Sequence, residues 1–426
     1  MLLTIYRLLA SLIYWILCPV IRLSPSGKTR LWRERLGVLE DGGHRHIWMH
    51  AASVGEVKVL GYLIDYLHKQ APSLTIHVTT MTRTGRQTAR ELLTERQNTV
   101  SVSYCPLDAA PAVHRTLDTV KPSLLLFAET EIWPNLVQIA ARRGIPVILV
   151  NGRMSEKAQR RYRPFSRSFG RVLACYERFF FKTTANAARF RHFGVPDARG
   201  TVTGDMKFDA PLPPRSEGRR REIRHRIGVS GEGFLFVAGS TRPGEERILA
   251  SVYKSLSASH AQFRLVLAPR HLDRVHEIKA MLTHEQLPFS IYGESPEEKT
   301  IVIVDRLGIL NDLYLAADAA FVGGTLVEIG GHNLLEPVWA GTPVLYGPHV
   351  ANVGEAASYI EKHNYGARVG SGEELAEMVK RIMDGTLTFT TKTEHDLHQS
   401  ATATVGRYIM DRLKDVGTRL EEDPAA

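Results

Sequence analysis

Cysteine is scarce in this sequence of 426 residues. The three cysteines, Cys18, Cys105 and Cys175, have no metal-ligand or redox spacing, so they predict a reducing compartment and no disulfide framework. No zinc-finger, RRM-like or KH-like signature occurs, and we therefore expect no nucleic-acid partner. The chain also lacks tandem repeats and low-complexity tracts. Its hydrophobic content of 44% and charged content of 23% are those of a globular protein.

A long apolar run is also missing. Residues 8–21 (LLASLIYWILCPVI) are uncharged, but they are shorter than the roughly 20 residues that an untilted helix needs to cross a bilayer. A span becomes possible if it is counted from Met1 to Leu23. No small-x-small cleavage site follows, and the basic residues after the run would keep the body of the protein cytoplasmic. We predict a membrane anchor helix within residues 1–30; the alternatives are a buried core helix or a helix that lies in the bilayer surface.

Negative charge is scarce in the first half. Residues 1–210 contain 30 Lys and Arg against 16 Asp and Glu, whereas the remainder contains 24 against 29. The first half is therefore expected to face something anionic, such as a membrane surface. Residues 152–171 have seven Lys and Arg against one Glu, interleaved with aromatic residues. Arg160, Arg161 and Arg163 of this segment are predicted to bind an anionic lipid headgroup, the alternative being a solvated helix face.

Near-continuous Val, Ile and Leu runs alternate with helix-like segments. The expected strands are 47–51, 74–79, 100–104, 124–127, 146–150, 179–182, 234–238, 263–268, 301–304, 320–322 and 344–346. Such runs are typical of parallel sheets that are covered on both faces. The fold class is therefore α/β, with two doubly wound Rossmann-like domains that face each other across a cleft. Ligands of this class bind at the carboxyl ends of the strands.

The domain boundaries follow from composition. Residues 209–218 (DAPLPPRSEG) contain three prolines and little to bury, so they are predicted to be the linker. Residues 31–208 would form the first domain and residues 219–394 the second. Residues 395–426 are expected to form a helix that packs back on the first domain.

The stretch HAASVGEVKVL, residues 50–60, follows the first expected strand. Ser53 and Glu56 have the spacing of a helix capping box, and Gly55 permits close approach of a ligand. Glu56 either fastens the helix end or serves as a general base, and the two roles are compatible. The positive end of the helix is expected to lower the pKa of Glu56.

Further polar loops follow other expected strands. FAETEIWPN carries Glu129 and Glu131. These two carboxylates are either functional groups at the strand end or ordinary helix caps. GSTRPGEE presents Ser240 and Thr241 for phosphate or a sugar oxygen, and APRH places Arg270 and His271 at the next strand end.

The stretch FVGGTLVEIGGHNLLEP is the most specific of these loops. It combines Gly330, Gly331, His332 and Asn333 with Glu336, which is predicted to accept from ribose hydroxyls or to close a second capping box. No Walker lysine is present, which argues against an ATPase. No G-x-G-x-x-G follows the first strand, which argues against a dehydrogenase.

Eight motifs in series make the chain similar to a known family. They are an apolar N-terminus, HAASVGE, TTMTRTG, AETEIWPN, GDMKFD, GST-x-x-GEE, APRH and FVGGTLVEIGGHNLLEP. In this order they resemble the bacterial 3-deoxy-D-manno-octulosonic acid (Kdo) transferases, which are lipid A-modifying glycosyltransferases of GT-B fold. The resemblance covers nearly the whole chain.

The resemblance implies an inverting transfer of Kdo from CMP-Kdo to the lipid A precursor lipid IVA, without metal or other cofactor. It places the protein at the cytoplasmic face of the inner membrane, in contact with inner-membrane lipids. Glu56 matches the catalytic base, and Glu129 and Lys207 match two further catalytic positions. Arg270 and residues 330–336 match the nucleotide side, with Ser240, Thr241 and His271 beside them, whereas Ser53, Gly55 and Arg83 belong to the acceptor side.

One motif departs from the family pattern. Family members commonly have Pro where Arg83 stands and a small polar residue where Arg86 stands, so two extra cations are expected near the acceptor. Two other hypotheses compete with Kdo transfer. One is another GT-B sugar transferase or a nucleotide-sugar epimerase, and the other is an inactive, membrane-tethered nucleotide-binding protein.

Overall fold

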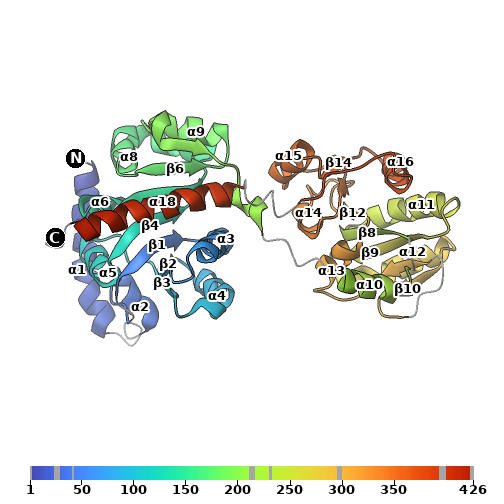
Figure 1. The fold of residues 1–426 in the computed structure, drawn as a ribbon, viewed down its shortest axis with the longest axis horizontal. Coiled ribbons are helices and arrows are strands. Elements are labelled where there is room, and N and C mark those ends of the chain that lie inside the picture. The colour runs from blue at the N-terminus through green and yellow to red at the C-terminus, as the bar shows by residue number, and fades with distance from the viewer. Residues whose placement is uncertain are drawn as a thin grey trace. The chain divides into compact units, whose positions relative to one another are not determined.

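The computed structural model of the protein describes residues 2–23, 29–40, 43–210, 216–229, 233–294, 300–392 and 400–422. The chain forms two compact units (Figure 1). The first contains residues 1–210 and 397–426, and the second contains residues 211–396.

A seven-stranded parallel sheet forms the centre of the first unit. Its strands are β1 (Arg45–Ala51), β2 (Ile76–Thr80), β3 (Val100–Tyr104), β4 (Pro122–Ala128), β5 (Val147–Gly152), β6 (Arg178–Phe181) and β7 (Gly200–Val202). They lie in the order β3-β2-β1-β4-β5-β6-β7, and every pair is parallel. The direction of progression reverses between β1 and β4, which makes their carboxyl ends the topological switch point where ligands bind in such sheets.

Helices cover both faces of this sheet. They are α1 (Leu2–Leu23), α2 (Arg30–Arg35), α3 (Val54–Gln70), α4 (Arg83–Leu92), α5 (Ala110–Val120), α6 (Pro134–Arg142), α7 (Glu156–Tyr162), α8 (Ser166–Leu173), α9 (Thr184–Arg191) and α18 (Ala401–Glu422). Neighbouring side chains of β1 alternate between the two cores: Met49 packs with α3, α4 and α18, and Trp48 packs with α5, α6 and α8.

The C-terminal helix α18 packs in the first unit, where it is drawn in red in Figure 1. Val405 and Ile409 lie in the same core as residues of α3. Asp209 accepts a hydrogen bond from the Thr402 backbone N–H at 2.7 Å. Asp209 is thus part of the first unit, so the linker expected over residues 209–218 is too long at that end. It is also too long at the other end, because the next helix begins at Glu217.

The second unit repeats the architecture. Its sheet consists of β8 (Phe234–Thr241), β9 (Phe263–Pro269), β10 (Phe289–Ile291), β11 (Ile301–Ile303), β12 (Ala319–Val322), β13 (Val344–Tyr346) and β14 (Gly366–Arg368). The order is β10-β11-β9-β8-β12-β13-β14, again all parallel. The switch point lies between β8 and β12. The predicted class of two doubly wound Rossmann-like domains is therefore confirmed.

The helices of the second unit lie on both sides of its sheet. They are α10 (Glu217–Arg226), α11 (Glu245–Ser257), α12 (Val275–His284), α13 (Leu310–Ala316), α14 (Leu335–Ala340), α15 (Gly354–Lys362) and α16 (Gly372–Met383). α11, α12 and α16 share one core with the strands.

Candidate active site

The loop between β1 and α3 forms the capping box that its sequence predicts. Ser53 is the N-cap residue, and its Oγ accepts from the Glu56 N–H at 3.4 Å. Both carboxylate oxygens of Glu56 also accept hydrogen bonds. Oε2 accepts from the Ala52 N–H and Oε1 accepts from the Ser53 hydroxyl, each at 2.8 Å. These bonds hold the carboxylate at the carboxyl end of β1, beside the switch point.

Burial outweighs the helix end in setting the acidity of Glu56. The residue is only 7% exposed, and this burial raises its pKa above the ordinary value of 4.5. The bonds from Ala52 and Ser53 oppose the shift, whereas the nearby carboxylates of Glu129 and Glu131 add to it. The expectation of a lowered pKa is therefore wrong, because it considered the helix end without the burial. A raised pKa makes Glu56 a stronger base.

Glu129 stands at the end of β4, across the switch point from Glu56. It adopts φ = 60°, a conformation that is uncommon for a residue other than glycine. Its carboxylate is buried and lies among three cations. Arg153 Nε is 2.7 Å from Oε2, while Lys207 Nζ and Lys182 Nζ are 3.2 Å and 3.4 Å from Oε1. The structure thus brings Glu129 and Lys207 together.

Residues at the ends of β5 and β6 extend this cluster. Lys182 Nζ also pairs with Asp205 Oδ2 at 2.9 Å. Asp205 accepts from Asn151 Nδ2 at 3.1 Å and from the Lys207 N–H at 2.9 Å. Asn151 is a second positive-φ residue, with φ = 54°. Sequence reasoning missed Lys182, Asn151 and Arg153, although each lies at or just after the end of a predicted strand.

Glu131 pairs with a buried histidine that the sequence did not single out. His50 is the residue before the terminal residue of β1, and its Nε2 lies 3.8 Å from Glu131 Oε2. Its Nδ1 lies 2.9 Å from Thr79 Oγ1. Burial lowers the pKa of His50, but Cys105 and Glu131 raise it to about 10. Trp133 Nε1 donates to the same Glu131 oxygen at 3.1 Å.

The two unusual cations of TTMTRTG have different environments. Arg83 is the first residue of α4 and is exposed near the carboxyl end of β2. Arg86 is buried: its Nη2 lies 2.9 Å from Glu34 Oε1, and its guanidinium lies over the Tyr104 ring at 4.7 Å. The expectation of two extra cations for the acceptor is therefore wrong for Arg86, which is neutralised inside the unit.

The basic segment forms α7, a short 3-10 turn and α8. Arg160, Arg161 and Arg163 are all exposed there. Arg160 pairs weakly with Glu156 at 3.4 Å. The exposed Phe165 follows them. These three cations lie on the surface of the first unit and do not pair with Glu129. The residue of this segment that pairs with Glu129 is Arg153.

In the second unit, a cluster of arginine and histidine lies at the carboxyl ends of β8 and β9. Arg242, which follows Ser240 and Thr241, donates from Nε to His332 Nε2 at 2.9 Å. Its Nη1 lies 2.8 Å from His271 Nε2. Because arginine only donates, each of these ring nitrogens accepts, and the hydrogen of each neutral ring is therefore on Nδ1. Ser240 has φ = 55° at this edge.

Burial lowers the pKa of His332, and Arg242, Arg270 and His271 lower it further. Arg270 also lowers the pKa of Glu336, although burial raises that pKa overall. Asn333 Nδ2 donates to Glu336 Oε1 at 3.0 Å. The N-cap residue of α14 is Leu334, which makes no side-chain capping bond, so the second capping box expected at Glu336 does not form.

The glycine-rich loop after β12 is held by one buried carboxylate. Glu245 Oε2 accepts from the N–H groups of Arg242 and Gly324, at 2.9 Å and 2.8 Å, and Oε1 accepts from those of Thr325 and Leu326, both at 3.0 Å. Gly323 must lack a side chain, since a Cβ there would lie 2.4 Å from the Ser240 carbonyl oxygen. The structure thus brings Ser240 and Thr241 against the loop that carries Gly330, Gly331 and His332.

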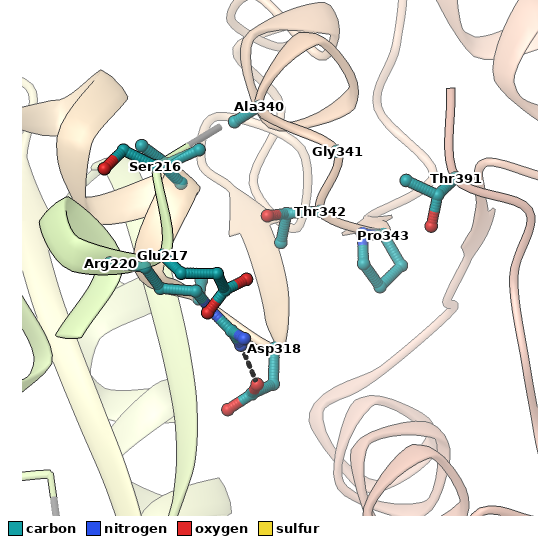
Figure 2. Close-up of a pocket in the computed structure, with 11 residues that line it drawn as sticks. Ser216, Glu217, Arg220, Asp318, Ala340, Gly341, Thr342, Pro343 and Thr391 are labelled. Carbon is teal, nitrogen blue, oxygen red and sulfur yellow. Dashed lines mark hydrogen bonds and ion pairs between the residues drawn. The ribbon is translucent and has the colours of Figure 1, made fainter. Parts of the chain in front are cut away.

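A pocket of about 310 Å³ lies at the opposite edge of the second sheet (Figure 2). Asp318 and Thr342–Pro343 line it and directly precede β12 and β13, so they stand at the amino ends of those strands. Arg220 of α10 pairs there with Asp318 at 2.7 Å. The predicted site residues follow carboxyl ends, and this pocket is therefore separate from them.

The chain is similar to known proteins both in sequence and in fold. Residues 30–210 match the family described as 3-Deoxy-D-manno-octulosonic-acid transferase (kdotransferase). The chain is 33% identical over 312 residues to a 3-deoxy-D-manno-octulosonic acid transferase of Haemophilus influenzae, and the match covers 72% of each chain. It is 32% identical over 342 residues to a bifunctional glycosyltransferase/methyltransferase of Fusobacterium nucleatum, covering 79% of this chain and 52% of that protein. The chain thus spans about half the length of the Fusobacterium protein.

Among solved structures, the chain is similar to the UDP-GlcNAc 2-epimerase of Neisseria meningitidis bound to UDP-GlcNAc. The TM-score is 0.55 and the identity is 14%, over 87% of this chain and 99% of that chain. At this identity the likeness shows the shared two-domain fold alone.

Proposed function

The chain belongs to the 3-deoxy-D-manno-octulosonic acid transferase family, and from this premise we propose that it transfers Kdo from CMP-Kdo to a hydroxyl of a lipid A precursor. The observation that carries the proposal is the placement of the motif residues. In both sheets they gather at the carboxyl ends of the strands that flank the switch point, Glu56 and Glu129 in the first unit and Ser240 and Thr241 with the glycine loop in the second.

Glu56 is the proposed general base. An acceptor hydroxyl is a poor nucleophile, so its proton must move to a base as the oxygen attacks. The oxygen forms a bond to the anomeric carbon of Kdo while the bond from that carbon to the CMP phosphate oxygen breaks. The proton passes to Glu56, and CMP leaves with the electron pair. Attack from the face opposite the leaving group inverts the anomeric configuration.

Cations of the second unit are proposed to receive the phosphate of CMP. Arg242 and Arg270 supply positive charge, and the Nδ1–H groups of His271 and His332 supply hydrogen bonds. Such fixed donors stabilise negative charge as it grows on a leaving group. Glu336 is left to accept from the ribose hydroxyls.

Mass spectrometry of a lipid A precursor incubated with the protein and CMP-Kdo tests the proposal. We expect a mass increase of one or more Kdo residues, which also counts how many are added. The assay is run with and without EDTA, because metal independence stays a prediction. An unchanged lipid mass with intact CMP-Kdo would contradict the proposed function.

The raised pKa of Glu56 predicts a pH dependence. The base must be unprotonated to act, so kcat/KM falls as the pH decreases through its pKa. Burial raises that pKa, and the acid limb of the pH profile should therefore lie above pH 4.5. Circular dichroism at each pH separates this limb from unfolding. An acid limb at or below 4.5 in the folded protein would show that another group is the base.

We further propose that α1 lies in the surface of the membrane, at the cytoplasmic face of the inner membrane. Within the described part of the chain, no helix combines the length and hydropathy needed to cross a bilayer. One face of α1 packs on the first unit through Tyr14 and Cys18. The large exposed apolar residues of α1 are Ile5, Tyr6, Leu8, Leu9, Leu12, Ile13, Trp15, Ile16, Leu17 and Leu23. A surface of this kind, with an exposed basic segment on the same unit, suits an anionic lipid surface.

Replacing Leu12 and Ile16 together by Glu is expected to weaken binding to phosphatidylglycerol vesicles at least about 100-fold, since each side chain loses about 1.5–3 kcal/mol of apolar transfer. Both residues are exposed, so the melting temperature should stay unchanged. Leu307→Glu is the control, because Leu307 is an exposed leucine of the second unit, 76% exposed against 56% for Leu12 and 58% for Ile16. Vesicle co-sedimentation measures the effect, and equal sedimentation of all three proteins would contradict the assignment of α1.

A further inference from the structure

Two partly exposed cations of the first unit share one buried carboxylate. Arg153 and Lys207 both pair with Glu129, at 2.7 Å and 3.2 Å. Their side chains are 57% and 40% exposed, whereas that of Glu129 is 4% exposed. The ion pair with Arg153 uses Nε, so the two terminal nitrogens of its guanidinium remain available to a ligand, as do hydrogens of the Lys207 ammonium.

The support beneath these cations is energetically unfavourable in two ways. Lys182 is almost fully buried between Glu129 and Asp205, and burying charges costs more than packing apolar side chains. Glu129 and Asn151 both have positive φ, a backbone conformation that is uncommon for residues other than glycine. Such features persist where they fix a functional group. Here they fix the positions of Arg153 and Lys207.

We propose that Arg153 and Lys207 form a binding site for the carboxylate of Kdo. This rests on the proposed function and deepens it by naming the group that the first unit recognises. The guanidinium offers planar N–H donors that match a planar carboxylate, and Lys207 adds a compact charge. A neutral hexose has no anionic group to pair with these cations, so the site favours a sugar acid.

The position of Lys207 links this site to the proposed base. A Cβ on Gly55 would lie 3.9 Å from Lys207 Nζ, and Gly55 directly precedes Glu56. In Kdo the carboxylate is bonded to the anomeric carbon, which is the carbon that reacts. A carboxylate held by Lys207 and Arg153 therefore brings the reacting carbon beside the loop that carries Glu56.

A pair of small ligands tests the site in the full-length protein. The methyl glycoside of Kdo is compared with its methyl ester, which lacks the negative charge, and binding is measured by ligand-detected NMR titration. We expect the wild type to bind the acid about 10-fold more tightly than the ester, the size of a charge-assisted hydrogen bond at a partly exposed site. Arg153→Gln should remove most of this preference, and Arg153→Lys should retain part of it.

Arg191→Gln is the matched control. Arg191 is 49% exposed and pairs with Asp197 at 3.3 Å, so it resembles Arg153 in exposure and pairing but lies outside the cluster. It should keep the full preference for the acid. Melting temperatures check that all variants are folded, because Glu129 still pairs with Lys182 and Lys207 when Arg153 is replaced.

Kinetics of Arg153→Gln show which Kdo the site holds. A higher KM for CMP-Kdo alone assigns the site to the donor, and a higher KM for a lipid that already carries Kdo assigns it to the acceptor; both support the inference. A wild type that binds acid and ester equally, or a preference unchanged in Arg153→Gln, overturns it. A preference that depends on Arg153 in a protein that transfers no Kdo would instead refute the proposed function.

Discussion

Glu56→Gln is expected to lower Kdo transfer at least about 100-fold while leaving the melting temperature unchanged. The amide oxygen of Gln can accept from the Ala52 N–H as the carboxylate does. The Ser53 hydroxyl can turn to accept from the amide instead of donating to the carboxylate. The capping box therefore survives the substitution, whereas an amide cannot take a proton from the acceptor.

A second capping box in the chain supplies the control. Glu374 of α16 accepts from the Gly370 N–H at 2.6 Å, and its own N–H donates to Ser371 Oγ at 3.2 Å. Glu374→Gln thus makes the same chemical change in the same local geometry, but away from the switch point. It should leave transfer and melting unchanged. Near-normal transfer by folded Glu56→Gln would show that Glu56 only fastens the helix.

The fold could be predicted wherever strands are buried on both faces. All eleven strands expected from apolar runs exist in the structure. The three that were missed, β7, β10 and β14, each have three residues and lie at sheet edges. An edge strand has one pairing partner and less to bury, so its sequence need not be a continuous apolar run. GTV and GAR carry no such signal.

The loops that carry the site could be predicted, because ligands of α/β sheets bind at the carboxyl ends of the strands. Loops after β1, β4, β8, β9 and β12 were selected because polar residues follow apolar runs, and the sheet order places them together in each unit. What could not be predicted is which side chains pair across strands. Lys182 follows an ordinary strand and looks like a solvated cation in the sequence. Only the neighbouring positions of β4, β5 and β6 bury it against Glu129.

The direction of the Glu56 pKa shift could not be predicted from the sequence either. The helix end is visible in the sequence and lowers a carboxylate pKa, but the degree of burial depends on the packed loop. The structure adds that burial, together with Glu129 and Glu131, and the direction of the shift changes. Arg86 is a parallel case, because its partner Glu34 lies 52 residues away in the chain.

Glu245→Gln is expected to destabilise the second unit by about 3 kcal/mol, because the new amide group meets two buried N–H donors instead of accepting from them. The carboxylate accepts from four backbone N–H groups, and Gln offers one acceptor oxygen. The loss falls on the segment that positions His332 and the second glycine pair. We therefore also expect CMP to bind at least about 10-fold more weakly, a loss of about 1.4 kcal/mol.

Glu246→Gln distinguishes a general loss of stability from a specific effect of the glycine loop on CMP binding. Glu246 is the next residue of α11 and is equally buried, but its carboxylate pairs with the Arg274 side chain at 2.8 Å rather than with the loop backbone. Its replacement should destabilise the unit and leave CMP affinity near that of the wild type. Denaturant unfolding and calorimetric titration with CMP measure the two quantities. If Glu245→Gln bound CMP as tightly as Glu246→Gln does, the glycine loop would not be part of the nucleotide site.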